Sequence, residues 1–192
     1  MVAMPFDEVN KFSDDVTIHF DADGKIRSKQ DEEDIIDELL DLYLLAYFSG
    51  VEAANSDIHT NIAPSEKEVL EIIDEPIAGE TWRERVHNYF ESGGNVYDIR
   101  RIAETDATRI YNTAVLDVAD RATPSVGSTT YKRWVTMQDD KVRETHDYLE
   151  GVAVPYDADF YTFDGDHARA PGLFALPENN INCRCTIELF RQ

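Results

Sequence analysis

The amino-acid sequence predicts an α+β fold with a helical N-terminal part, a long central helix and a small mixed C-terminal α/β module. Up to residue 122, apolar residues recur at the spacing of amphipathic helices. After residue 130, short alternating stretches and loops rich in Gly and Pro replace that pattern. The break at Gly93 and Gly94 is the best candidate boundary, so we divide the chain into an acidic, mainly helical region, 1–94, and a second domain, 95–192.

The first 50 residues contain one clear helix. Residues 1–30 are expected to be irregular or weakly β, because 16–20 alternates and 21–24 has the Asp and Gly composition of a turn. A helix is predicted over 31–48, where acidic residues favour the N-terminal end of the helix dipole and an apolar stripe follows. Gly50 is expected to end this helix.

Three further helices are predicted before residue 123. Two short ones, over 65–73 and 81–91, each begin with a capping box, in which a hydroxyl side chain and a Glu three residues later satisfy free N–H groups. The third is long and spans 96–122, with one broad apolar face. The capping pairs are Ser65 with Glu68 and Thr81 with Glu84.

The C-terminal module is expected to combine short strands, loops and one helix. Its Gly and Pro residues divide the alternating stretches into short pieces. The expected elements are a loop over 123–130, a strand over 131–137, a short helix over 139–149, strand and loop pieces over 152–163, a loop-rich segment over 164–180 and a closing strand over 185–190.

The chain is strongly and unevenly acidic. It has 39 Asp and Glu against 18 Lys and Arg, a formal charge of −21, and residues 1–100 hold 24 of the acids and 8 of the bases. A protein that coats nucleic acid must neutralise phosphates, so we expect no direct sequence-specific nucleic acid binding. No apolar run approaches the roughly 20 residues that cross a bilayer, so no membrane partner is expected. Only six of the bases are Lys, which favours a halophilic protein.

Three motifs in the second half are informative in combination. They are residues 101–112, RIAETDATRIYN, residues 132–151, KRWVTMQDDKVRETHDYLEG, and residues 180–186, NINCRCT. Their order and spacing resemble the phage Mu F-like minor head protein family, also called the phage head morphogenesis domain. The resemblance covers residues 95–192. Glu150 departs from it, because Asp is more usual at that position.

This resemblance implies a function. A family member is expected to be a structural minor head (capsid) protein in the virion of a tailed virus, acting in head assembly at the portal or the inner capsid surface. Its expected partners are the portal protein and the major capsid protein. Its expected locations are the virion head and, during assembly, the host cytoplasm. Residues 1–94 would then form the docking region, and the acidic composition points to a haloarchaeal virus.

A set of Cys, His and carboxylate side chains within these motifs is suited to Zn²⁺. His146 is expected on the short helix with Asp139 two turns earlier on the same face. Cys183 and Cys185 would reach them if the closing strand packs beside that helix. Against zinc, Cys-x-Cys is shorter than the usual spacing of structural sites, and we expect the two sulfurs to point apart. No other cofactor is expected.

A hydrogen-bond network without metal is the preferred interpretation of the same residues, with each Cys acting as a small buried apolar side chain. A Cys–His hydrolase is the enzymatic alternative, but the sequence displays neither an oxyanion hole nor an orienting third group, so we do not expect an enzyme. The residues of the expected network are Asp139, Arg143, His146, Asn182 and Arg184.

Three other interpretations stay open. A toxin-like effector is conceivable because similar domains occur fused to toxins, although a fused toxin needs a further domain of about 100 residues or more. An assembly chaperone that is absent from the mature virion is the second. The third is base stacking on Tyr131 and Trp134 beside Lys132 and Arg133, for which we prefer core packing.

The acidic composition predicts salt-dependent stability. If the protein is halophilic, screening of its carboxylates in molar KCl raises its melting temperature above the value in dilute buffer. Thermal melts over a KCl series measure this dependence. Equal melting temperatures at low and molar salt would contradict the halophilic interpretation.

Overall fold

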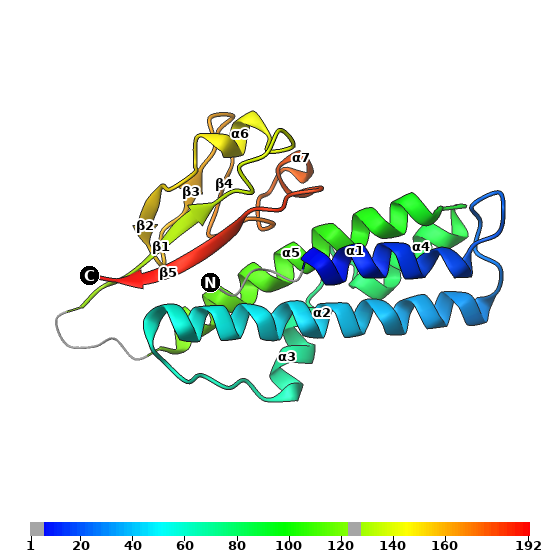
Figure 1. The fold of residues 1–192 in the computed structure, drawn as a ribbon, viewed down its shortest axis with the longest axis horizontal. Coiled ribbons are helices and arrows are strands. Elements are labelled where there is room, and N and C mark those ends of the chain that lie inside the picture. Colours follow the sequence, from blue (N-terminus) through cyan, green and yellow to red (C-terminus); the bar gives the residue numbers. More distant parts are fainter. Residues whose placement is uncertain (1–5, 123–127) are drawn as a thin grey trace.

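The computed structural model describes residues 6–122 and 128–192 and has the predicted α+β architecture (Figure 1). Long helices come first in the chain and short strands follow. The helical elements are α1 (Phe6–Asp15), the 3-10 helix η1 (Val16–His19), α2 (Lys29–Ile58), α3 (Glu66–Ile73), α4 (Trp82–Glu91), α5 (Val96–Arg121), α6 (Glu144–Asp147) and α7 (Pro177–Asn180).

Two long helices, α2 and α5, lie side by side at the centre of the helical part (Figure 1). The Tyr43 hydroxyl of α2 donates a hydrogen bond to Asp106 of α5, and Gly50 lies against Tyr111 further along both helices. The two helices therefore run in the same direction. Helices α1 and α4 contact both members of this pair, and α3 contacts α2.

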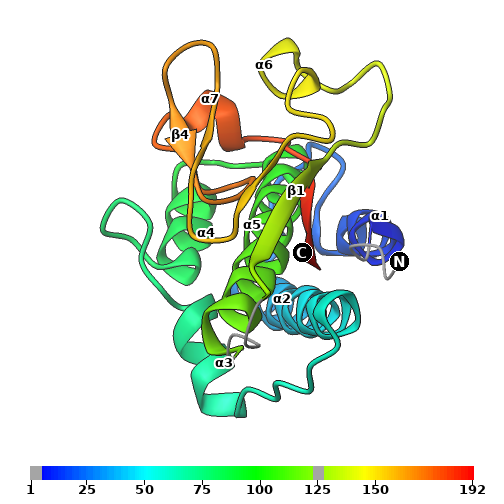
Figure 2. The same cartoon turned by 90° about the vertical axis from the view of Figure 1, so that its left-hand side faces the viewer.

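The strands form a small antiparallel module that packs on α5 (Figure 2). A three-stranded sheet has the order β2-β1-β5, and β3 and β4 form a separate two-stranded sheet. Strand β5 contacts both α5 and α2. All described strand pairs are antiparallel. The strands are β1 (Thr130–Val135), β2 (Ala153–Pro155), β3 (Phe160–Tyr161), β4 (His167–Ala168) and β5 (Thr186–Arg191).

One apolar core includes residues from both sides of the sequence break at Gly93. Tyr43 and Tyr47 of α2 and Ile110 of α5 are fully buried in it, and Trp134 of β1 joins the same cluster. The division into 1–94 and 95–192 therefore stays a prediction about function, because in the fold the two segments are packed together.

The N-terminal segment is more helical than the sequence analysis expected. Residues 6–15 form α1, and residues 16–19 form η1 in place of a β-like stretch. The expectation was wrong because Val9, Phe12 and Val16 recur at helical spacing and are buried in the core. The turn at 21–24 is confirmed, with Gly24 at a positive φ of 76°.

Helix α2 continues ten residues beyond the predicted end at 48. Gly50 does not end the helix. It lies in the helix interior at the point where α2 packs closely on α5. A Cβ at Gly50 would lie 2.5 Å from the Tyr111 carbonyl oxygen and 2.9 Å from the Ala114 Cβ. Glycine therefore allows the close approach of α2 and α5, and the helix ends at His59, which adopts the left-handed conformation.

The other three predicted helices of the first half are confirmed. Helices α3 and α4 each begin with the expected capping box, and α5 spans almost all of 96–122. The predicted loop over 123–130 lies mostly outside the described residues. A further capping box, between Asn95 and Asp98, starts α5.

The predicted helix over 139–149 is wrong for most of its length. Only Glu144–Asp147 is helical, as α6. Upstream, Gln138 has a positive φ of 53°, and the Asp139 carboxylate accepts a hydrogen bond from the Lys141 N–H. Such a local side-chain bond competes with helical hydrogen bonding. Asp139 therefore does not share a helix face with His146.

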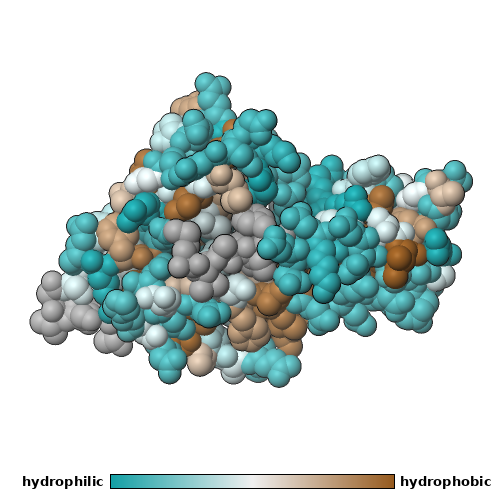
Figure 3. Space-filling model, in the orientation of Figure 1, coloured by the Kyte–Doolittle hydropathy of each residue, from teal (hydrophilic) through white to brown (hydrophobic). Residues whose placement is uncertain are grey.

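The surface is predominantly hydrophilic, as the charge requires, with small hydrophobic areas that include one over α2 (Figure 3). Within residues 6–122 and 128–192, no helix has both the length and the apolar composition to cross a lipid bilayer.

The substitution Gly50→Ala tests the close approach of α2 and α5. The added methyl group clashes with backbone, so we expect the free energy of unfolding to fall by about 1–3 kcal/mol. Urea denaturation measures this, with Glu52→Ala at an exposed position of the same helix as the control. Equal free energies of unfolding for the two variants would show that α2 and α5 can move apart to accept the methyl group without loss of stability.

Candidate functional site

The structure brings the imidazole of His146 and the two thiols together. His146 lies on α6, and both cysteines precede β5. The distances from His146 Nδ1 to the sulfurs are 3.5 Å for Cys183 and 3.7 Å for Cys185. All three side chains are buried. This set is called the thiol–imidazole cluster below.

The expectation that the two sulfurs point apart was wrong. Residues two positions apart in an extended chain project to the same side, so Cys183 and Cys185 both face His146. Arg184 between them projects the other way and pairs with Asp139. The chain enters this extended segment through Asn182, which has a positive φ of 56°.

The two thiols have opposite pKa shifts. A hydrogen bond from the Cys185 thiol, assisted by His146, holds the pKa of Cys183 well below its ordinary value despite burial. The same hydrogen bond to Cys183, together with burial, raises the pKa of Cys185 far above its ordinary value. The contact between the two thiols therefore acts on their pKa values in opposite directions.

Aromatic side chains fix the orientation of the His146 ring. Trp134 lies edge-on to it with ring centroids 5.1 Å apart, and Phe174 stacks on it at 5.5 Å. His146 Nε2 is buried and has no hydrogen-bond partner among the described residues. The ring can therefore present only Nδ1 to the cysteines.

Asp139 lies outside the thiol–imidazole cluster. Both of its carboxylate oxygens accept hydrogen bonds from the Arg184 guanidinium, at 2.9 Å and 2.7 Å. These hydrogen bonds lower the pKa of Asp139. Arg184 also lies 3.8 Å from Glu104 of α5. The predicted fourth metal ligand is thus used as an ion-pair partner, and three candidate ligands remain.

The other residues of the expected network hold the Asn-Cys-Arg-Cys turn. Arg143 donates hydrogen bonds to the backbone carbonyls of Glu178 and Ile181. The Asn182 N–H donates to the Thr105 hydroxyl of α5 over 3.1 Å. The turn is therefore anchored to α5 on one side and to the segment before α6 on the other.

Asn112 is a key residue to which the sequence analysis gave no role. Its side-chain N–H₂ donates to the carbonyls of Thr108, Pro171 and Cys185, and its Oδ1 accepts from the Ile187 N–H at 3.0 Å. The side chain is fully buried. It therefore joins α5, the loop at 171 and the start of β5. Its position among apolar residues of the helix face was the signal for this role.

Asp106 is a second buried polar residue of α5 to which the sequence analysis gave no role, and it faces the helical part of the fold. It accepts hydrogen bonds from Arg85 of α4 at 2.7 Å and from Tyr43 of α2 at 3.3 Å, and Arg109 lies 3.9 Å away. The RIAETDATRIYN motif therefore supplies buried polar contacts in both directions from α5.

Lys132 and Trp134 are core residues of β1 and are not available for base stacking. The Lys132 ammonium has no hydrogen-bond partner among the described residues and lies 5.3 Å from the Phe160 ring centroid. Burial lowers the pKa of Lys132 to about 8.

The thiol–imidazole cluster lines a very small hollow. The hollow that the three residues line, with Met137, Lys141 and Arg143 among its other walls, has a volume of about 10 Å³. A cavity of this size holds about one water molecule, whereas small-molecule sites have volumes of about 300 Å³ or more. A compact α+β module that carries a buried thiol–imidazole cluster is the class of protein that this geometry defines.

Comparison with known families assigns the chain to one of them. Residues 66–188, more than half of the chain, match the family described as Phage Mu protein F like protein. This protein belongs to that family. The match begins at α3, before the boundary predicted at 94/95, and ends within β5.

Two curated proteins illustrate the relationship. The chain is 34% identical over 86 residues to NAD(+)–arginine ADP-ribosyltransferase EFV of Enterococcus faecalis, which is 45% of this chain and 17% of that protein. It is 26% identical over 114 residues to Minor head protein GP7 of Bacillus phage SPP1, which is 58% of this chain and 36% of that protein. The chain thus spans well under two thirds of either relative. No solved structure matches it.

The substitution Asn112→Ala tests the junction between α5 and the module. It leaves the carbonyls of Pro171 and Cys185 and the N–H of Ile187 without their bond to the side chain, so we expect the free energy of unfolding to fall by about 2–4 kcal/mol. Urea denaturation measures the loss, with the exposed Asn88→Ala as the matched control. A loss no larger than that of the control would contradict the role of Asn112.

The substitution Lys132→Met tests the cost of the buried ammonium. Because the folded-state pKa lies below the unfolded value, stability should rise as pH increases from about 8 to about 10.5. At pH 7 the variant should be more stable than the wild-type protein by about 1–3 kcal/mol, and this gain should shrink above pH 10. Free energies of unfolding of the variant and the wild-type protein at pH 7 and above pH 10 measure this difference in stability. A variant that is less stable than the wild-type protein at pH 7 would contradict the account.

Proposed function

We propose that this protein is a minor head protein of a tailed virus that acts in head assembly at the portal or the inner capsid surface and stays in the virion head. Family membership over residues 66–188 carries the proposal, and the named role of the SPP1 relative supports it. The matched segment includes α5, β1, β2 and the first residues of β5, together with His146, Cys183 and Cys185. Its mechanism is binding to neighbouring head proteins.

The closed thiol–imidazole cluster argues against the hydrolase alternative. A nucleophilic Cys183 with His146 as its base needs a space for the acyl group and its oxyanion. The hollow of about 10 Å³ at the thiols is too small for these groups. A larger hollow of about 1070 Å³ shares Met137, Lys141 and Arg143 with it, but neither His146 nor either cysteine lines that larger hollow. The similarity to the ADP-ribosyltransferase involves 17% of that protein, and the activity in its name does not pass to this chain.

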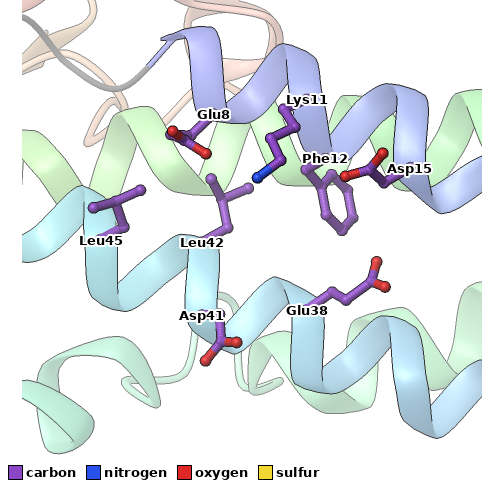
Figure 4. Close-up of a pocket in the computed structure, with 8 residues that line it drawn as sticks. All are labelled: Glu8, Lys11, Phe12, Asp15, Glu38, Asp41, Leu42 and Leu45. Carbon is purple, nitrogen blue, oxygen red and sulfur yellow. The ribbon is translucent and has the colours of Figure 1, made fainter.

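A groove between α1 and α2 is the surface that we assign to docking (Figure 4). Leu45, which lines the groove, and Phe48 on the same helix are 41% and 46% exposed. The groove combines an apolar floor with four carboxylates and one ammonium, so a head protein that presents an apolar side chain flanked by Lys or Arg fits it. Its lining residues are Glu8, Lys11, Phe12, Asp15, Glu38, Asp41, Leu42 and Leu45.

Mass spectrometry of purified virions tests the proposed function directly. We expect the protein in mature particles of the virus that encodes it. Its presence in proheads and absence from mature particles would support the assembly-chaperone alternative instead. Absence from both would overturn a structural role in the head.

The double substitution Leu45→Ser and Phe48→Ser tests the docking surface. Both side chains are exposed on α2, so the fold should persist while co-purification with the portal protein or the major capsid protein falls by at least about tenfold. The control is Ile18→Ser, which removes an apolar side chain that is 64% exposed on η1. Equal recovery of head proteins with both variants would move the interface elsewhere.

A further inference from the structure

The thiol–imidazole cluster has the dimensions of a metal site. In a tetrahedral zinc centre, Zn–S bonds of about 2.3 Å and Zn–N bonds of about 2.0–2.1 Å hold the sulfur and nitrogen ligands about 3.5–3.6 Å apart. The distances from His146 Nδ1 to the sulfurs of Cys183 and Cys185 are 3.5 Å and 3.7 Å. The three ligand atoms all lie within 4.8 Å of one another.

Both sulfurs converge on one ring nitrogen. An imidazole nitrogen forms one hydrogen bond, as a donor or as an acceptor according to its tautomer, and Cys185 also bonds to Cys183. Both Cys183 and Cys185 nevertheless place their sulfurs against the same atom, His146 Nδ1. An ion between the three atoms would use all of them at once.

Charge balance also favours a divalent ion. Two thiolates and a neutral imidazole around Zn²⁺ carry no net charge, which suits a buried site. No carboxylate is needed, because Asp139 is already paired with Arg184. The adjoining hollow has room for about one water molecule, which would complete a four-coordinate centre.

We propose that His146, Cys183 and Cys185 bind one zinc ion that cross-links α6 to the segment before β5. Cys183 and Cys185 lie 37 and 39 residues after His146 in the chain. The intervening segment contains only short strands and the four-residue helix α7. A cross-link at its two ends would stabilise a part of the module that has little regular secondary structure. This role is independent of which head protein the chain contacts.

Zinc content is the first measurement. The full chain, purified with zinc and a thiol reductant and then dialysed, should hold about one zinc per chain. Each of His146→Gln, Cys183→Ser and Cys185→Ser should lower this to about 0.2 or less. His167→Gln removes an exposed imidazole that pairs with Asp159, and Asp139→Asn removes the carboxylate outside the cluster, so both controls should retain the metal.

Cobalt substitution keeps the test decisive if a cysteine variant fails to fold. In the wild-type protein, Co²⁺ in this site should give a thiolate-to-cobalt charge-transfer band in the near ultraviolet, and added Zn²⁺ should abolish it. A folded wild-type protein that binds no zinc and shows no such band would overturn the proposal. So would zinc that folded variants of all three ligands retain at the wild-type level, because that metal would be adventitious.

Discussion

Helix α5 is buried on two opposite sides, and the rest of the fold depends on satisfying its polar groups on both. On one side, Asp106 meets Arg85 and Tyr43 of the helical part. On the other, Asn112 bonds the backbone around Cys185 and Ile187. A buried amide or carboxylate without partners costs more than an apolar side chain would, so α5 is stable only when both neighbours are in place. This requirement couples the helices to the small sheet.

The same requirement explains the residue types of the three motifs. The first motif lies on α5 and provides Asp106, Thr105 and Asn112 as contacts. The second provides Arg143 and His146, and the third provides the turn that they hold. The motifs that identify the family are thus mainly the residues that close the module. Binding of other head proteins would use the outer surface, and the acidic groove of α1 and α2 is separate from this closure.

The sequence was sufficient for elements that local chemistry determines. The capping boxes at Ser65 and Thr81 and the length of α5 follow from short-range patterns. The sequence was insufficient where a contact between residues far apart in the chain determines the local structure. Gly50 has the local appearance of a helix end, yet Tyr111, about 60 positions later, makes it an interior residue. For the candidate site, the meeting of His146 with the cysteines was anticipated as a condition, and Asp139 and Arg184 were both placed in the expected network. That they form a bidentate pair with each other, away from His146, was not anticipated.

Cooperativity of the whole chain is the central consequence of a doubly buried α5. Native-state hydrogen exchange over a denaturant series measures it without any substitution. The slowest amides of α2, α5, β1 and β5 should converge on one opening free energy and one denaturant dependence. Exchange of the β1 and β5 amides through a separate opening of lower free energy, while α2 and α5 stay protected, would contradict this account.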